Sequence, residues 1–88
     1  MDGNNMEITV LYFASYKENS GIDKENLVLD SERDFMLSDI LKVILTKHPK
    51  IPTPQEKIVA AINEEYQPHN HKVYDGDIIA LIPPVSGG

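Results

Sequence analysis

The sequence has no cysteine and no tryptophan among its 88 residues. The absence of cysteine excludes a disulfide, a thiolate metal site and a cysteine nucleophile, so any sulfur chemistry has to take place on another group. The first residues have neither the basic start nor the apolar segment of a secretory signal, and no apolar run is long enough to cross a bilayer. We therefore expect a soluble, cytoplasmic protein.

Basic residues are also scarce. Eight lysines and arginines stand against 14 aspartates and glutamates, which gives a net charge of −6. Nucleic acids and anionic membranes attract proteins through basic patches, so this balance disfavours both as partners. An acidic chain suits association with a basic protein surface. Solubility alone explains the charge equally well.

The length of the chain is enough for one domain with one modest core, because chains near this size bury somewhat more than about 60% of their unfolded surface. Hydrophobic residues make up 41% of the sequence and charged residues 25%, so the domain should fold without a metal or a cross-link. We expect a flexible N-terminal extension over residues 1–5, a folded domain over 6–82 and an extended C-terminal tail over 83–88.

Two apolar segments at opposite ends of the chain predict strands. Residues 8–13 and 78–82 are rich in β-branched and aromatic side chains and show little alternation, which is typical of strands covered on both faces. Residues 26–29 predict another strand. Between the strands at 8–13 and 26–29, the polar residues 14–21 predict a short helical turn that ends near Gly21.

The clearest periodicity in the chain predicts an amphipathic helix. Apolar side chains recur with the spacing of one helix face at Leu37, Ile40, Leu41, Ile44 and Leu45. Both Asp34 and Ser38 are candidates to cap its start. Lys47 and His48 suit the negative end of the helix dipole, and Pro49 ends the helix.

The segment after the helix contains a loop, a hairpin and a turn. Pro52 and Pro54 predict a loop over residues 50–56, and residues 58–62 predict a strand. Asn63 and Glu64 suit a tight hairpin turn, because Asn tolerates the left-handed backbone region, and residues 65–67 form the short partner strand. Residues 68–71 predict another loop, and 75–77 predict a turn before the last strand.

This order of elements predicts an α+β fold. Because the helix lies between the early and late strands, a right-handed crossover can bring the last strand parallel to the first. The expected architecture is the ubiquitin-like β-grasp: a mixed sheet with the first and last strands parallel at its centre and one main helix packed on one face.

The chain ends in an unusual segment, Pro83-Pro84-Val85-Ser86-Gly87-Gly88. Glycine has no Cβ, so two consecutive glycines can pass through a channel too narrow for other residues. The two prolines favour an extended path that projects the tail from the domain. An ordinary frayed end is the alternative. We predict that the carboxylate of Gly88 is the reactive group.

These segments resemble one family in particular. The strand at 8–13 followed by Ala14, the turn at 75–77, the strand at 78–82 and above all the Pro-Pro-Val-Ser-Gly-Gly ending resemble the small, sulfur-carrying subunit of molybdopterin synthase. The resemblance extends from Met6 onward. Its specific part is the ending, and the rest is shared with other ubiquitin-like carriers.

The resemblance implies a reaction cycle at Gly88. An activating enzyme related to ubiquitin-activating enzymes uses ATP to form an acyl-adenylate, so that AMP is attached covalently and transiently, and sulfur then replaces AMP. The thiocarboxylate enters the large synthase subunit, in a heterotetramer of two small and two large subunits. There it gives sulfur to cyclic pyranopterin monophosphate, which builds the dithiolene that later holds molybdenum. The small subunit by itself is then not catalytic.

The resemblance also assigns roles within the tail. Gly87 and Gly88 let the acyl carbon reach two enzyme sites, and the rigidity of Pro83 and Pro84 lowers the ordering cost of docking. Val85 is expected to anchor the tail by apolar contact. Ser86 either forms a hydrogen bond within the channel or is a solvated spacer.

A docking patch at the base of the tail is implied in the same way. By position it comprises Phe13, Tyr66 and Ile82. Tyr66 departs from the usual aliphatic residue, and its hydroxyl needs a partner or water in an interface. For Phe13 and Ile82, packing in the core is the alternative.

The remaining polar residues do not suggest an active site. His69 and His71 could share a metal in an extended segment, but no third ligand is apparent, so we predict no metal site. The acidic residues cluster at predicted turns, where burial is not expected to raise their pKa values. No nucleophile elbow and no glycine-rich phosphate loop is present.

Two other classes of function share the same terminal chemistry or fold. A related sulfur carrier for thiamine synthesis or transfer-RNA thiolation is one, although the Pro-Pro-Val-Ser spacer favours the molybdopterin synthase subunit. A ubiquitin-like protein modifier or a plain interaction module is the other.

Overall fold

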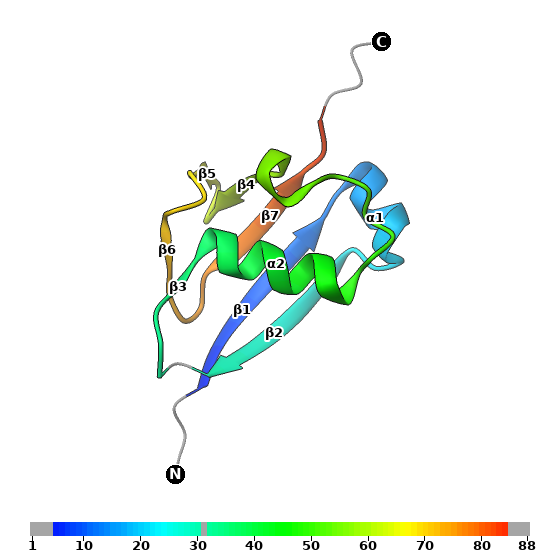
Figure 1. The fold of residues 1–88 in the computed structure, drawn as a ribbon. Helices are drawn as coiled ribbons and strands as arrows, with labels where there is room; N and C mark the ends of the chain where they lie inside the picture. The colour runs from blue at the N-terminus through cyan, green and yellow to red at the C-terminus, as the bar shows by residue number, and fades with distance from the viewer. Residues whose placement is uncertain (1–4, 31, 85–88) are drawn as a thin grey trace.

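The computed structural model describes residues 5–30 and 32–84. The elements in chain order are β1 (Asn5–Tyr12), α1 (Ala14–Ser20), β2 (Lys24–Asp30), β3 (Phe35–Met36), α2 (Leu37–Lys47), the 3-10 helix η1 (Gln55–Lys57), β4 (Val59–Ile62), β5 (Glu65–Tyr66), β6 (Lys72–Val73) and β7 (Ile78–Ile82). Figure 1 shows α2 lying across the strands of the main sheet. Strand β1 begins one residue before the expected domain boundary, because Asn5 pairs with Asp30.

The main sheet has five strands in the order β2-β1-β7-β4-β5. Strand β7 is central and runs parallel to its neighbour β1, in a register that pairs Thr9 with Ile78 and Tyr12 with Leu81. The other pairs, β1 with β2, β7 with β4 and β4 with β5, are antiparallel. The mixed sheet with parallel first and last strands confirms the α+β, ubiquitin-like β-grasp architecture.

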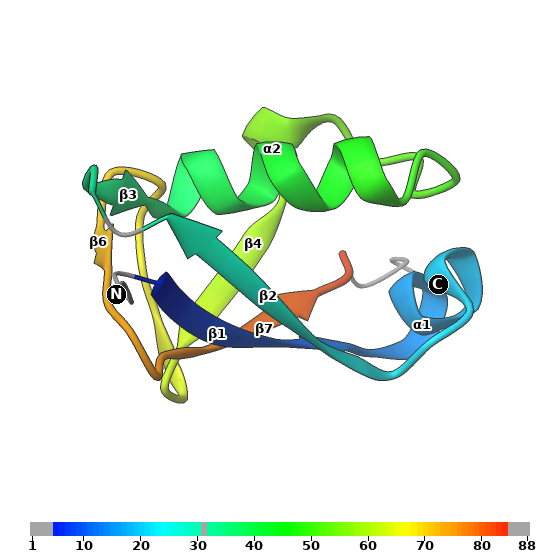
Figure 2. The same cartoon turned by 90° about the horizontal axis from the view of Figure 1, so that it is seen from below.

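The core lies between α2 and one face of the sheet. Figure 2 shows α2 and η1 on that side of the strands. The helix contributes Leu37, Ile40, Leu41 and Ile44, all of them fully buried as the periodicity predicts. Leu45 is only partly buried. Each fully buried aliphatic side chain of this size contributes about 1.5–3 kcal/mol, so this helix face is a main source of the stability of the fold.

The two apolar strands are each buried on one face only, and the expectation that both of their faces are covered is wrong. In β1, Val10 and Tyr12 are buried whereas Leu11 between them is partly exposed. In β7, Ile79 is buried and Ile78 is 45% exposed. The reason is that α2 covers a single face of the sheet, so alternate side chains of each strand point away from the core.

The start of α2 differs from the prediction. The residue before the helix is Met36, and Ser38 lies inside the helix, so neither Asp34 nor Ser38 caps it. Instead, Oδ2 of Asp39 accepts a hydrogen bond from the Met36 backbone N–H at 2.9 Å. A carboxylate in the first helical turn also complements the positive end of the helix dipole.

The loop over residues 68–71 supplies the other partners of the helix start. The backbone N–H groups of Leu37 and Ser38 donate to the carbonyl oxygens of His71 and His69, at 2.8 and 2.9 Å. Nε2 of His69 also lies 2.7 Å from the carbonyl oxygen of Ile58. The two histidines therefore belong to a structural junction. Just beyond it, β3 and β6 form a small antiparallel pair that the sequence did not predict.

The turns follow the sequence closely. Asn63 and Glu64, which join β4 to β5, both have positive φ angles, 51° and 74°. Gly76 in the turn before β7 has φ 87°, and Gly21 ends α1 in the left-handed conformation with φ 80°. All of these positions were predicted as turns or helix ends. None of the helices within residues 5–30 and 32–84 has the length and apolar character needed to cross a membrane.

Candidate functional site

The tail begins at the end of the central strand. Strand β7 ends at Ile82, after which Pro83 is partly exposed and Pro84 is exposed. Figure 1 shows this segment leaving the end of the sheet. The predicted tail residues Val85, Ser86, Gly87 and Gly88 lie outside the described residues, so their roles stay predictions.

Beside the start of the tail, the sheet presents the face that α2 does not cover. The register places Ile82 opposite Val59, and Ala80 between Leu11 and Ala61. Tyr66 pairs with Ala61, so it points to the same side. We call this surface the open face and define it by seven residues, Leu11, Phe13, Val59, Tyr66, Ile78, Ala80 and Ile82.

The three predicted docking residues all lie on the open face. Phe13 is 46% exposed and Tyr66 is 68% exposed, while Ile82 is partly exposed. The alternative that Phe13 packs in the core is therefore wrong, because none of the helices within residues 5–30 and 32–84 covers that face. A group of exposed apolar side chains on one surface is typical of a protein interaction site.

Sequence reasoning missed the other members of the open face. Val59 and Ile78 are about as exposed as Phe13, and with Leu11 and Ala80 they join the three predicted residues into one surface. A shallow groove on this face is lined by Leu11, Phe13, Asn63, Glu64, Ile78 and Ala80. The signal that could have found them is the two-residue period of a strand with one covered face, applied to residues 8–13, 58–62 and 78–82.

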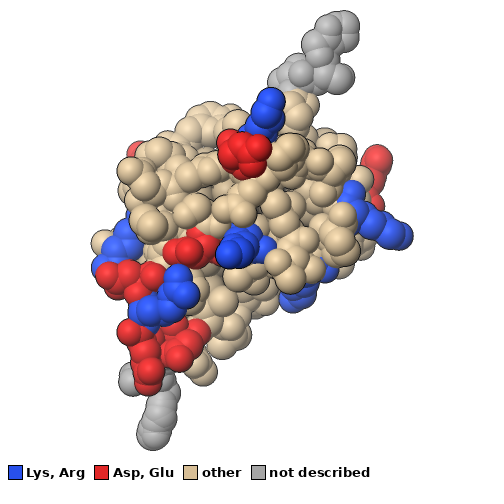
Figure 3. All heavy atoms as spheres, in the orientation of Figure 1, with Lys and Arg blue, Asp and Glu red and all other residues tan. Residues whose placement is uncertain are grey.

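The opposite side of the sheet, which carries α2, bears charged side chains, whereas the open face is apolar. Figure 3 shows acidic and basic side chains gathered there in small mixed clusters. Ion pairs join Arg33 to Asp39 at 3.4 Å and Lys72 to Asp34 at 3.2 Å. Exposed pairs of this kind contribute little to stability. This side shows no broad surface of one charge that would attract a strongly charged partner.

A partly buried polar network lies at the end of β1, directly before Phe13. The hydroxyl of Tyr12 donates to Oε2 of Glu25 on β2. Nε2 of His48 lies 2.6 Å from the same oxygen, and Nζ of Lys47 lies 2.8 Å from Oε1. The network thus joins β1, β2 and the end of α2 on the core side of the sheet.

The network shifts the pKa values of two of its members in opposite directions. Burial alone would raise the pKa of Glu25, but hydrogen bonds from Lys47, Tyr12 and His48 and the charge of His48 outweigh it, so the pKa is lowered. The pKa of the Tyr12 hydroxyl is raised far above its usual value of 10.0. Burial is the main cause, and the hydrogen bond to Glu25 and the negative charge of the Glu25 carboxylate add to it.

These directions predict acid sensitivity. A carboxyl whose pKa is lowered by folding stabilises the protein above its unfolded pKa, near 4.5, and this contribution is lost as the pH falls through the lower folded value. We expect the melting temperature to fall as the pH drops below 4.5, and to fall less steeply in Glu25→Gln than in the wild type. Thermal unfolding across this range measures both. Equal slopes would show that Glu25 is not the responsible group.

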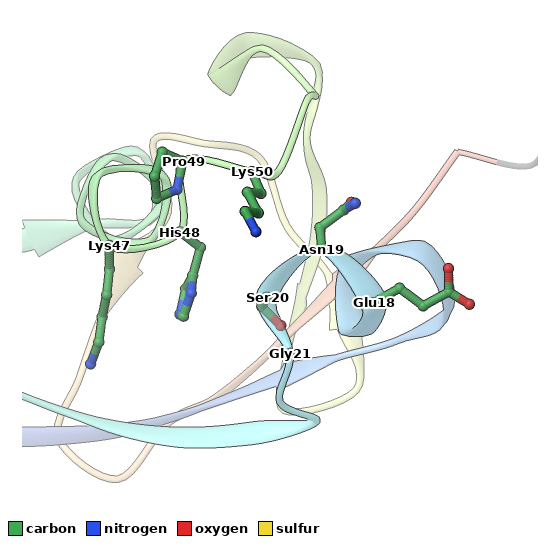
Figure 4. A pocket seen from close by; sticks show the side chains of 8 residues that line it. All are labelled: Glu18, Asn19, Ser20, Gly21, Lys47, His48, Pro49 and Lys50. Atoms are coloured by element: carbon green, nitrogen blue, oxygen red, sulfur yellow. The ribbon is translucent and has the colours of Figure 1, made fainter.

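A second hollow lies between the end of α1 and the end of α2. Figure 4 shows the side chains that line it, among them Lys47, His48 and Lys50 from the end of α2 and the residues after it. Lys47 and His48 are already engaged with Glu25. Among the residues that the structure describes, no three or more histidine, aspartate or glutamate side chains are arranged to hold a metal ion. The described residues of this hollow therefore do not form a metal-binding cluster.

The fold and the site together define a class of protein. A five-stranded mixed sheet with parallel first and last strands, a helix on one face and exposed apolar side chains on the other define a ubiquitin-like β-grasp protein. Residues 10–88 match the ThiS family. The chain belongs to this family.

Individual relatives agree with this assignment. The molybdopterin synthase sulfur carrier subunit of Chlamydomonas reinhardtii is 36% identical over 94% of this chain and 100% of its own length. SAMP1 of Haloferax volcanii, a small archaeal modifier protein, superposes with a TM-score of 0.77 at 26% identity, over 93% of this chain and 99% of its own.

A second similar structure is a complex. It contains subunits 1 and 2 of the molybdopterin-converting factor of Helicobacter pylori. The matching chain is 27% identical, with a TM-score of 0.59, over 94% of this chain and 100% of its own.

Proposed function

We propose that this protein is the sulfur carrier of molybdopterin synthase and that Gly88 carries the sulfur. The observation that supports this most strongly is the likeness to the Chlamydomonas reinhardtii sulfur carrier subunit along the full length of that protein. The tail supports it as well, because Pro83 and Pro84 follow directly from the central strand and lead into two glycines. The chemistry then rests on a terminal group, which accords with a sequence that has no cysteine.

The proposed cycle begins with activation of the Gly88 carboxylate. A carboxylate is a poor electrophile, so its oxygen first attacks the α-phosphorus of ATP, and pyrophosphate leaves. Hydrosulfide from a sulfur donor then attacks the acyl carbon of the adenylate, and AMP leaves with the C–O bond broken. The resulting thiocarboxylate gives its sulfur to cyclic pyranopterin monophosphate, and water supplies the oxygen that restores the carboxylate. ATP and AMP are thus transient partners of Gly88 and not resident cofactors.

We assign the catalytic residues of this cycle to two partners, the large synthase subunit and the activating enzyme. The assignment of the large subunit as a partner is supported by the Helicobacter pylori complex, in which the matching chain is paired with a second subunit. The activating enzyme, the arrangement of two small and two large subunits and a cytosolic location stay predictions. The open face is the proposed docking surface, with Phe13, Tyr66 and Ile82 near the base of the tail.

Phe13→Ala tests the docking role. Phe13 is half exposed on the open face, so we expect the substitution to weaken binding to the large subunit by about tenfold or more, as at an interface hot spot, with little change in melting temperature. Tyr74→Ala is a matched control, because Tyr74 is an exposed aromatic residue outside the open face. Calorimetric titration measures both affinities. Equal affinities for Phe13→Ala and wild type would contradict the docking role.

A second candidate function is protein modification. It is favoured by the structural likeness to SAMP1 of Haloferax volcanii, which is named a modifier. A modifier would form isopeptide conjugates that disappear when Gly88 is deleted.

A carrier for thiamine synthesis or transfer-RNA thiolation is the remaining alternative. Its test uses separate cell lines, each of which lacks the carrier of one pathway. Such a carrier would restore thiamine synthesis or transfer-RNA thiolation in these cells and would not restore molybdoenzyme activity. Restored molybdoenzyme activity without conjugates would favour the sulfur carrier of molybdopterin synthase.

A further inference from the structure

Glu64 lies at the edge of the groove on the open face. Leu11, Phe13, Ile78 and Ala80 form its apolar walls, and the turn between β4 and β5 supplies its polar end. Glu64 is exposed, and within residues 5–30 and 32–84 its carboxylate has no ion pair or hydrogen bond. A carboxylate beside an apolar groove suits a partner that brings an apolar side chain and a positive charge together.

The backbone at Glu64 is strained. Its φ of 74° lies in the left-handed region, which is costly for any residue with a side chain other than asparagine or aspartate. In a two-residue hairpin turn with both φ angles positive, glycine is the favoured second residue. Glutamate therefore occupies a position where glycine would fold more easily. Strain that persists in a hydrogen-bonded turn is a reason to look for a function of the side chain.

Asn63 holds this turn firmly against β7. Its backbone N–H donates to the carbonyl oxygen of Ile78 at 2.8 Å, and its Oδ1 accepts from the Ile78 N–H at 3.0 Å. Its Nδ2 donates to Oδ1 of Asp77 at 3.0 Å. Three hydrogen bonds from one residue fix the position of its neighbour Glu64 relative to the groove. The backbone that carries Glu64 therefore does not have to be ordered when a partner binds.

We infer that Glu64 is a docking contact, whose carboxylate pairs with a lysine or arginine of the large synthase subunit while the groove takes an apolar side chain next to that residue. This inference rests on the proposed function. The net charge of −6 favours a basic partner surface, and the aliphatic stem of a lysine or arginine can cover the apolar wall while its charge reaches Glu64. Association is then steered by charge and depends on ionic strength.

The next residue provides a matched control. Glu65 carries the same charge one position later, but it pairs with Ile62, whose side chain lies on the core face of the sheet. Alternation along β5 therefore directs Glu65 away from the open face, to which Tyr66 points. Removal of the Glu65 charge changes the net charge equally without changing the groove.

The test compares Glu64→Gln, Glu64→Gly and Glu65→Gln in the full chain. Glu64→Gln removes the charge and keeps the strain, and Glu64→Gly removes both. We expect both Glu64 variants to associate with the large subunit about threefold or more slowly at low ionic strength, with the difference lost near 1 M salt. Glu65→Gln should match the wild type. Glu64→Gly should also raise the melting temperature by about 4 °C, because the strain is relieved.

The possible outcomes separate this inference from the proposed function. If the wild type binds the large subunit and Glu64→Gln binds at the same rate, the inference is overturned and the proposed function stands. Equal slowing in Glu64→Gln and Glu65→Gln would also overturn it, since only net charge would then matter. If the wild type does not bind the large subunit at all, the proposed function fails and the inference fails with it.

Discussion

Deletion of Gly88 is expected to abolish sulfur transfer and to leave the melting temperature almost unchanged. The reason is that the last residue of the core is Leu81, and the chain after Ile82 contributes no buried side chain within the described residues. On the proposed function, folding and sulfur transfer therefore depend on different parts of the sequence. The measurement combines thermal unfolding with conversion of the pterin precursor by the large subunit, after loading with the activating enzyme, ATP and a sulfur source.

A truncation at the other end of the chain is the control for this prediction. Residues 1–4 precede β1, so their removal should leave both transfer and melting temperature close to the wild-type values. Sulfur transfer by the chain without Gly88 would contradict the proposed role of the terminal carboxylate. A large fall in melting temperature would contradict the separation of the tail from the fold.

Leu41→Ala is expected to have the largest effect on stability. Leu41 lies in the middle of α2 and is 0% exposed, so truncation removes buried apolar surface and leaves a cavity. Substitutions of this kind lower the free energy of unfolding by about 2–5 kcal/mol. For a domain of this size each kcal/mol corresponds to about 4–8 °C in melting temperature. Urea denaturation measures the change.

Two other substitutions at this helix serve as controls. Leu41→Met nearly conserves volume and should cost less than about 1.5 kcal/mol. Lys42→Ala changes an exposed neighbour and should stay within about 0.5 kcal/mol of the wild type. A loss below about 1 kcal/mol in Leu41→Ala would contradict the account of the core, because a well-packed buried leucine cannot be removed so easily.

The sequence was most informative where structure depends on nearby residues. The spacing of Leu37, Ile40, Leu41 and Ile44 predicted the buried face of α2, and Pro49 its end. Asn63 and Glu64 predicted the hairpin turn because asparagine tolerates the left-handed region. The parallel pairing of β1 with β7 followed from the order of the elements and from the handedness of crossover connections.

Features that depend on distant residues could not be predicted in the same way. The start of α2 is held by carbonyl groups of His69 and His71, which are more than thirty positions away in the sequence. The strands β3 and β6 have two residues each, too few to show a period. The network around Glu25 depends on the end of α2 meeting β2, which only the folded chain brings about.

The candidate site was predicted in part, and largely by resemblance. Phe13, Tyr66 and Ile82 were named from their positions in a family pattern, and the structure places them on one face. Because both faces of β1 and β7 were expected to be covered, Leu11, Ile78 and Ala80 were missed, and Val59 on β4 was missed because no exposed face was predicted for that strand. Glu64 was treated only as a turn residue, because neither its strain nor its place beside the groove is visible without coordinates.

The intact mass of the protein after incubation with the activating enzyme, ATP and a sulfur source tests the central claim most directly. The account predicts a species in which one oxygen is replaced by one sulfur, with fragmentation of the chain locating the change at Gly88. The species should revert to the carboxylate when the large subunit and the pterin precursor are added. An unchanged mass under conditions that load a control carrier, or sulfur located at any other residue, would contradict the claim.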